Sequence, residues 1–205
     1  QKNTIEEQKG IVDLAYGELE EKNKEILDSI KYAKRIQSAI LPPSMLVKEY
    51  LQDSFILYLP KDIVAGDFYW MEQRENKTLF AACDCTGHGV PGALVSVICV
   101  NGLNRSVREY GLTDPGKILD KTREIVISEF EKSEDEVKDG MDVSLVCLED
   151  NKIQWAGANN PLWLIRNGEL IVYKPDSQPI GKYANPSPFT THTIEVQKDD
   201  LIYVF

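Results

Sequence analysis

The chain has 205 residues, 42% of them hydrophobic, which is enough for one domain with a core and an added segment but not for two ordinary domains. Its 23 basic and 33 acidic side chains give a net charge of −10, which argues against general nucleic-acid binding because such a surface repels phosphate. No run reaches the ~18 apolar residues of a membrane span, and the polar start lacks the apolar core of a signal peptide. The four cysteines form no CxxC pair, which indicates buried thiols of a reducing compartment. We therefore expect a cytoplasmic protein, either free or attached to a membrane-bound sensor domain upstream.

Residues 1–41 are predicted to form one long helix that ends before Pro42 and Pro43, because the residue before a proline avoids the helical region. Apolar side chains recur at a spacing of seven, the period of a helix that faces a partner helix, at Ile5, Val12, Leu19, Ile26, Ala33 and Ile40. A second, mixed row lies four residues further on and includes Asn23 and Gln37. We expect a homodimeric coiled coil with the seam Val12, Leu19, Ile26, Ala33 and Ile40. A single amphipathic helix packed on its own domain is the alternative.

Residues 42–205 are predicted to form an α+β body. Short apolar runs bounded by turn residues indicate strands, and two longer segments with proline in the first turn indicate helices. The expected strands are 54–59, 68–71, 78–83, 143–148, 152–156, 162–166, 169–173, 190–196 and 201–205, and the expected helices are 91–110 and about 114–132. Residues 133–140 and 175–188 are expected to be loops. This order favours helices packed outside one or two antiparallel sheets.

Two acidic turns concentrate the chemistry. Asp67 follows Gly66 at the start of an aromatic strand, and Asp84 ends a strand before a glycine-rich turn that contains Gly87, His88 and Gly89. Two carboxylates at neighbouring strand ends, together with backbone oxygens, suit hard cations such as Mg²⁺ or Mn²⁺. The residues alone also fit plainer roles, since a Gly–Asp pair often forms a turn and a glycine pair before a helix serves tight packing.

Several motifs, in order along the chain, carry a resemblance to a known family. They are Gly-Asp-Phe-Tyr at 66–69, Asp-x-Thr-Gly-His-Gly-Val-Pro-Gly-Ala at 84–93, and the segments 139–145, 155–162, 178–181 and 198–205. Residues 54–205 thereby resemble the SpoIIE/RsbU-type branch of the metal-dependent protein serine/threonine phosphatases, the PPM family. Residues 29–37 resemble the linker helix that often precedes these domains in bacterial sensors.

The resemblance implies a phosphatase αββα sandwich, in which two antiparallel sheets lie between helices and two Mn²⁺ or Mg²⁺ ions bind at one end. It assigns metal binding and catalysis to Asp67 and Asp84, further metal binding to the backbone carbonyl of Cys85, and the shaping of the turn to Gly66, Gly87, His88 and Gly89. It implies attack of a metal-activated water on phosphoserine or phosphothreonine. The expected substrate is a phosphorylated bacterial regulatory protein, such as an anti-sigma-factor antagonist, and the expected regulation comes through the N-terminal helix from an upstream sensor.

One difference between this sequence and the family pattern lowers the activity that we expect. In the family a strand like 201–205 is followed by an Asp-Gly turn that supplies another metal ligand, and the sequence given stops at Phe205. The resemblance places Asp142 outside the metal cluster, so two carboxylates remain, which are too few for two hard cations with about six ligands each. We therefore expect the 205 residues alone to be weakly active or inactive. Two alternatives stay open, a catalytically inactive dimeric docking module and a metal hydrolase that acts on small phosphoesters.

Overall fold

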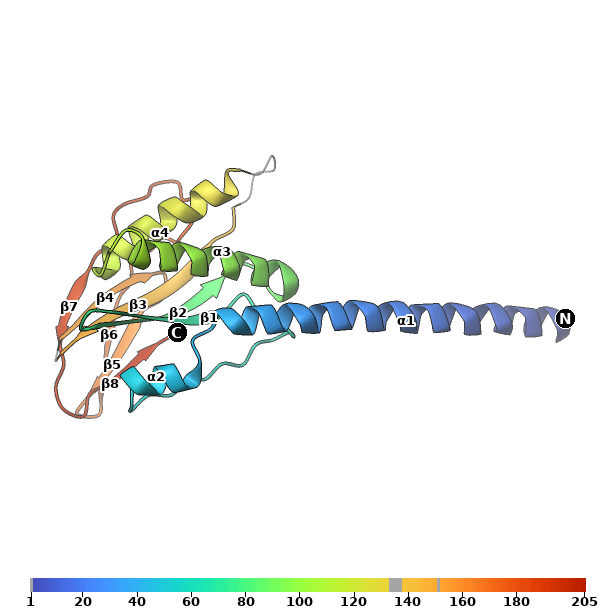
Figure 1. The fold of residues 1–205 in the computed structure, drawn as a ribbon, viewed down its shortest axis with the longest axis horizontal. Coiled ribbons are helices and arrows are strands. Elements are labelled where there is room, and N and C mark those ends of the chain that lie inside the picture. The colour runs from blue at the N-terminus through green and yellow to red at the C-terminus, as the bar shows by residue number, and fades with distance from the viewer. Residues whose placement is uncertain (1, 133–137, 151) are drawn as a thin grey trace.

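The computed structural model describes residues 2–132, 138–150 and 152–205. Helix α1 (Lys2–Ile40) extends far from the body of the molecule, with the N-terminus at its outer end (Figure 1). The helix ends where the double proline predicts. The predicted N-terminal arm is therefore present as α1, and the dimerisation of two such arms remains a prediction.

A five-stranded antiparallel sheet forms the centre of the body. Its strands run in the order β1 (Phe68–Arg74), β2 (Lys77–Cys85), β3 (Met141–Glu149), β4 (Lys152–Ala158) and β7 (His192–Glu195). A second antiparallel sheet has the order β6 (Glu169–Tyr173), β5 (Leu162–Arg166) and β8 (Leu201–Val204). The predicted fold class, an α+β phosphatase sandwich with a long N-terminal helix, is confirmed.

Two helices cover one face of the five-stranded sheet (Figure 1). Helix α3 (Gly89–Arg108) carries Pro91 in its first turn, and helix α4 (Pro115–Phe130) is capped by Asp114, whose carboxylate accepts a hydrogen bond of 3.0 Å from the backbone N–H of Lys117. These helices bury side chains from alternate positions of the central strands. The result is one core between helices and sheet, and a second core between the two sheets.

Helix α3 is long and apolar enough to cross a membrane by length and composition, but half of that window is buried inside the domain. Cys99 and Leu103 in the middle of the helix are fully buried within the core between helices and sheet. Among the described ranges no other helix passes this test. Helix α3 therefore behaves as the core helix of the domain.

Two local expectations fail. Residues 54–59 do not form a strand, and their side chains are largely exposed, Leu57 and Leu59 by 75% and 80%. Their apolar pattern is not sufficient, because no partner strand supplies backbone hydrogen bonds among the described residues. The ring of Phe55 lies 6.2 Å from that of Tyr203 in the second sheet. The short helix α2 (Ser44–Tyr50) was not expected. Most of the expected loop at 133–140 lies outside the described residues.

Candidate metal centre

Three carboxylates lie in a row across the ends of three neighbouring strands. Asp67 immediately precedes β1, whose first residue, Phe68, is paired with Cys83, so that Asp67 lies opposite Asp84. Asp84 is in turn paired with Asp142 on β3. Since Cys83 and Cys85 are buried on the helix side of β2, alternation directs Asp84 to the other face.

The pKa values of two of these carboxyls reflect this crowding. Burial is the main cause that raises the pKa of Asp67, and a hydrogen bond with the Asp84 carboxyl and its negative charge raise it further. Burial also raises the pKa of Asp142, the charge of Asp84 adds to this, and a hydrogen bond of 2.8 Å from the Asn159 amide opposes it. The negative charges of the three neighbouring carboxylates thus repel one another, and a bound cation would reduce this repulsion.

Backbone segments pack directly against one another behind Asp67. A Cβ atom at Gly66 would lie 2.6 Å from the carbonyl oxygen of Gly87 and 2.9 Å from that of Cys85. A Cβ atom at Gly92, in the first turns of α3, would lie 2.5 Å from the same Gly87 oxygen. Only glycine allows these approaches, so Gly66 and Gly92 let the two acidic turns pack together, and Gly87 adopts the positive φ of 86° that turns its carbonyl toward them.

Thr86 joins the turn after β2 to the turn before β3. Its hydroxyl donates a hydrogen bond of 2.7 Å to Asp139, and its backbone N–H donates one of 3.0 Å to the carbonyl of Gly140. Gly140 lies against Ile180, where a Cβ atom would meet the Ile180 carbonyl oxygen at 2.2 Å, and Ile180 pairs with Met141 through two backbone hydrogen bonds. The segment 178–181 therefore forms a wall of the site.

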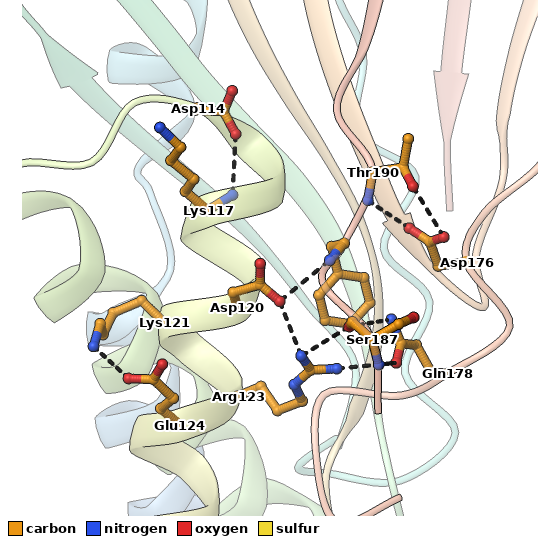
Figure 2. Close-up of polar contacts among 11 residues, drawn as sticks. Asp114, Lys117, Asp120, Lys121, Arg123, Glu124, Asp176, Gln178, Ser187 and Thr190 are labelled. Carbon is orange, nitrogen blue, oxygen red and sulfur yellow. Dashed lines mark hydrogen bonds and ion pairs between the residues drawn. The ribbon is translucent and has the colours of Figure 1, made fainter. Parts of the chain in front are cut away.

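The long loop that carries this wall is held from α4. Figure 2 shows Arg123 donating to the side chain of Gln178 and to the carbonyl of Ser187, at 3.0 Å and 2.9 Å. Gln178 itself is 3% exposed and exchanges two further hydrogen bonds with the backbone of Ser187. At the base of the loop, Asp176 accepts hydrogen bonds from Thr190 (Figure 2). The loop thus has a defined path beside the carboxylates.

These segments enclose an open cleft of about 550 Å³. Its floor and walls carry both signs of charge, and the lining residues that matter for chemistry are Lys61, Asp67, Asp84, His88, Asp142 and Lys182. The imidazole Nδ1 of His88 lies 2.9 Å from a carboxylate oxygen of Asp62, in the loop before β1. Lysines beside carboxylates are suited to a ligand that combines a cation with an anionic group.

The chemistry of these donors fits a hard divalent cation, because Asp67, Asp84 and the backbone offer oxygen ligands. Across residues 2–132, 138–150 and 152–205, no group of three or more His, Cys, Asp or Glu side chains is close enough to hold one ion. The thiol of Cys85 is buried in the core, and its pKa is raised by a hydrogen bond with Cys99 and by burial, so it offers no thiolate. Any contribution of Cys85 to a metal comes from its carbonyl.

The family model described as Stage II sporulation protein E matches residues 74–205, which include the turn after Asp84 and the wall at 178–181. The chain belongs to the SpoIIE family. The match begins after Asp67 and the arm. Comparison with curated protein sequences gives no match.

The fold of this chain is also similar to the folds of several solved structures. The SiaA-PP2C domain of Pseudomonas aeruginosa is 29% identical, with a TM-score of 0.78, over 89% of this chain and 72% of that one. The PP2C phosphatase domain and regulatory fragment of SpoIIE from Bacillus subtilis is 20% identical, with a TM-score of 0.53, over 68% of this chain and 39% of that one. The catalytic domain of the serine/threonine phosphatase PstP, in complex with two manganese ions, is 16% identical, with a TM-score of 0.53 and 72% of each chain covered. The last two show the shared fold alone.

The structure brings the two predicted acidic turns into contact, with Gly66 and Gly87 between them and His88 and Gly89 at the entrance of α3. It also places Asp142 directly beside Asp84 in the lining of the cleft, although among the described residues Asp142 does not complete a three-residue metal group. Sequence reasoning missed the link between Thr86 and Asp139 and the pair of His88 with Asp62. No local pattern signals contacts between segments so far apart in the chain.

Proposed function

We propose that this SpoIIE-family domain is a signalling protein phosphatase that hydrolyses phosphoserine or phosphothreonine on a bacterial regulatory protein, such as an anti-sigma-factor antagonist, with two Mn²⁺ or Mg²⁺ ions. The observation that carries the proposal is the meeting of Asp67 and Asp84 at one end of a PP2C-type sandwich, inside an open cleft. A cleft open to solvent admits a phosphorylated side chain presented by a folded partner.

In this proposal Asp67, Asp84 and the carbonyl of Cys85 hold the ions. The ions, when bound, supply the positive charge that lowers the pKa of a bound water and neutralises the phosphoryl oxygens. Lys61 and Lys182 at the rim attract the phosphate dianion toward the carboxylate row. His88, held through Nδ1 by Asp62, lines the cleft and shapes the turn beside the carboxylates.

The arm supplies the proposed regulation. Val12, Leu19 and Ile26 are 50%, 55% and 57% exposed at heptad spacing, which a second copy of the same helix would cover. The last seam residue, Ile40, packs partly against the domain core, and Ala33 is partly covered, so the proposed dimer contact lies in the outer part of the helix. An upstream sensor that changes the pairing of two arms would act on both domains.

The test is Mn²⁺-dependent phosphate release from a phosphoserine protein by the full-length protein, with Asp84→Asn as the matched variant. Activity that requires Mn²⁺ and is lost in Asp84→Asn is the expected result. A folded protein without activity at any Mn²⁺ concentration would favour the docking module instead. Faster turnover of p-nitrophenyl phosphate than of any phosphoprotein would favour the small-phosphoester hydrolase. The cytoplasmic location is part of the same proposal.

A further inference from the structure

The arm helix reaches the candidate metal centre through one buried polar side chain. Gln37 lies three residues before the end of α1 and is only 3% exposed. The heptad pattern assigns Gln37 to the second row of a helix–helix seam. The structure corrects this interpretation, because the Gln37 side chain is buried in its own domain, whereas the neighbouring side chain of Ile36 is exposed.

The amide of Gln37 pairs with the backbone of Ala65 as a second strand would. Its Nε2 donates a hydrogen bond of 2.6 Å to the Ala65 carbonyl, and its Oε1 accepts one of 3.1 Å from the Ala65 N–H. Nε2 also lies 3.3 Å from the hydroxyl of Ser96 on α3. Ala65 is buried and lies in an irregular loop, so this side chain satisfies both of its backbone groups.

A second contact from the same turn of α1 reaches another residue of the segment before β1, Tyr58. The ammonium group of Lys34 lies 5.5 Å from the centre of the Tyr58 ring, and the Tyr58 hydroxyl donates a hydrogen bond of 3.0 Å to the carbonyl of Asp67. Lys34 and Gln37 are three residues apart and therefore share a face of α1. The arm thus contacts Ala65 directly and reaches the backbone of Asp67 through Tyr58.

We propose that Gln37 is a positioning residue for the metal centre. Its amide fixes the backbone of Ala65, which holds Gly66 against the carbonyls of Cys85 and Gly87 and so sets the place of Asp67. The arm helix is then a structural part of the site rather than an attached dimerisation segment. This inference rests on the proposed function only in taking Asp67 and the Cys85 carbonyl as metal ligands.

The variant Gln37→Met keeps the length and volume of the side chain and removes its two hydrogen bonds with Ala65 and the one with Ser96. Gln8→Met, at an exposed position on the same helix, is the matched control. We expect Gln37→Met to weaken the binding of Mn²⁺ alone about tenfold, the factor of one lost hydrogen bond of ordinary strength. Amide hydrogen exchange in residues 64–67 should accelerate by about the same factor or more, while exchange in β3 and β4 stays slow. Gln8→Met should leave both quantities unchanged.

A milder variant keeps the test decisive if Gln37→Met does not fold. Tyr58→Phe removes only the hydrogen bond to the Asp67 carbonyl, so it should weaken Mn²⁺ binding less than Gln37→Met. Unchanged Mn²⁺ affinity and unchanged exchange at 64–67 in folded variants would overturn the proposal, as would acceleration that is uniform over the domain. Neither measurement uses a phosphorylated substrate, so a wild-type protein that binds Mn²⁺ without hydrolysing phosphoproteins would refute the proposed function and not this inference.

Discussion

The hydroxyl of Thr86 donates to the carboxylate of Asp139 at 2.7 Å and also accepts a hydrogen bond from the backbone N–H of Gly140. One side chain thereby connects the turn after Asp84 with the turn before Asp142. Both turns depend on it, because neither is part of a regular strand at that point. We expect this connection to matter for the shape of the cleft.

Thr86→Val preserves the shape of the side chain and removes its hydrogen bonds. We expect a loss of about 1 kcal/mol of unfolding free energy, since the group is partly exposed to water, and a larger proportional loss of Mn²⁺-dependent phosphatase activity. Denaturant unfolding and activity assays measure the two effects. Thr78→Val, which removes a hydrogen bond to Gln73 at the other end of β2, is the control. Equal activity in the two variants would show that Thr86 has no special role in the cleft.

The outer arm provides a prediction about assembly. Leu19→Glu places a charge in the proposed seam, and Leu14→Glu places the same charge at an exposed off-seam position of the same helix. Burying an unpaired charge costs more than ~1.4 kcal/mol, so Leu19→Glu should weaken self-association at least about tenfold, and Leu14→Glu should not. Analytical ultracentrifugation measures both. A wild-type chain that sediments as a monomer at all accessible concentrations would remove the dimer from the proposal.

The core between the two sheets provides a prediction about stability. Leu164 on β5 is 1% exposed between the sheets, whereas the preceding residue, Trp163, is 39% exposed on the outer face. Leu164→Ala should lower the unfolding free energy by ~2–5 kcal/mol, because it removes buried methyl groups and leaves a cavity. Trp163→Ala, which removes a larger side chain, should cost less. The reverse order in urea unfolding would mean that the outer face is covered in solution.

Asp200, the residue before β8, provides a prediction about the pH dependence of stability. Asp200 accepts two hydrogen bonds from the guanidinium of Arg166, at 2.9 Å and 2.7 Å, which is the main reason that its pKa is lowered to about 2. Because the pKa is lower in the folded state than the ~3.9 of an unfolded chain, this contribution is complete above that value and is lost as the pH falls through about 2. Asp200→Asn should therefore lower the melting temperature at pH 7, and the difference from wild type should disappear near pH 2. A constant difference over the whole range would assign the effect to packing instead.

Much of the fold follows from local patterns in the sequence. The alternation of β2 already separates the buried Cys83 and Cys85 from Asp84, and the short connection between β1 and β2 places Asp67 opposite Asp84. Both acidic turns were therefore predictable as neighbours. Their glycines were predictable as turn residues because the chain must bend sharply after a strand.

Other features depend on contacts that no local pattern encodes. Residues 54–59 have the composition of a strand, but a strand also requires a partner, and none pairs with them among the described residues. The heptad pattern fits Gln37 equally well as a residue of a helix–helix seam or as a residue buried in its own domain. The fold decides between them, because it brings Gln37 into contact with Ala65, 28 positions further along the chain. The place of Asp142 depends likewise on the pairing of β2 with β3.

The contacts that hold the cleft together come from distant parts of the chain, from the arm at Gln37, which holds Ala65, to the pairing of Ile180 with Met141. During synthesis the chain emerges from its N-terminus, so the arm and the turn around Asp84 leave the ribosome long before Ile180 does. The nascent protein therefore carries an incomplete row of carboxylates until Asp142 and the segment 178–181 have been made. The cleft, and any ability to hold ions in it, is complete only after Ile180 has been made and has paired with Met141.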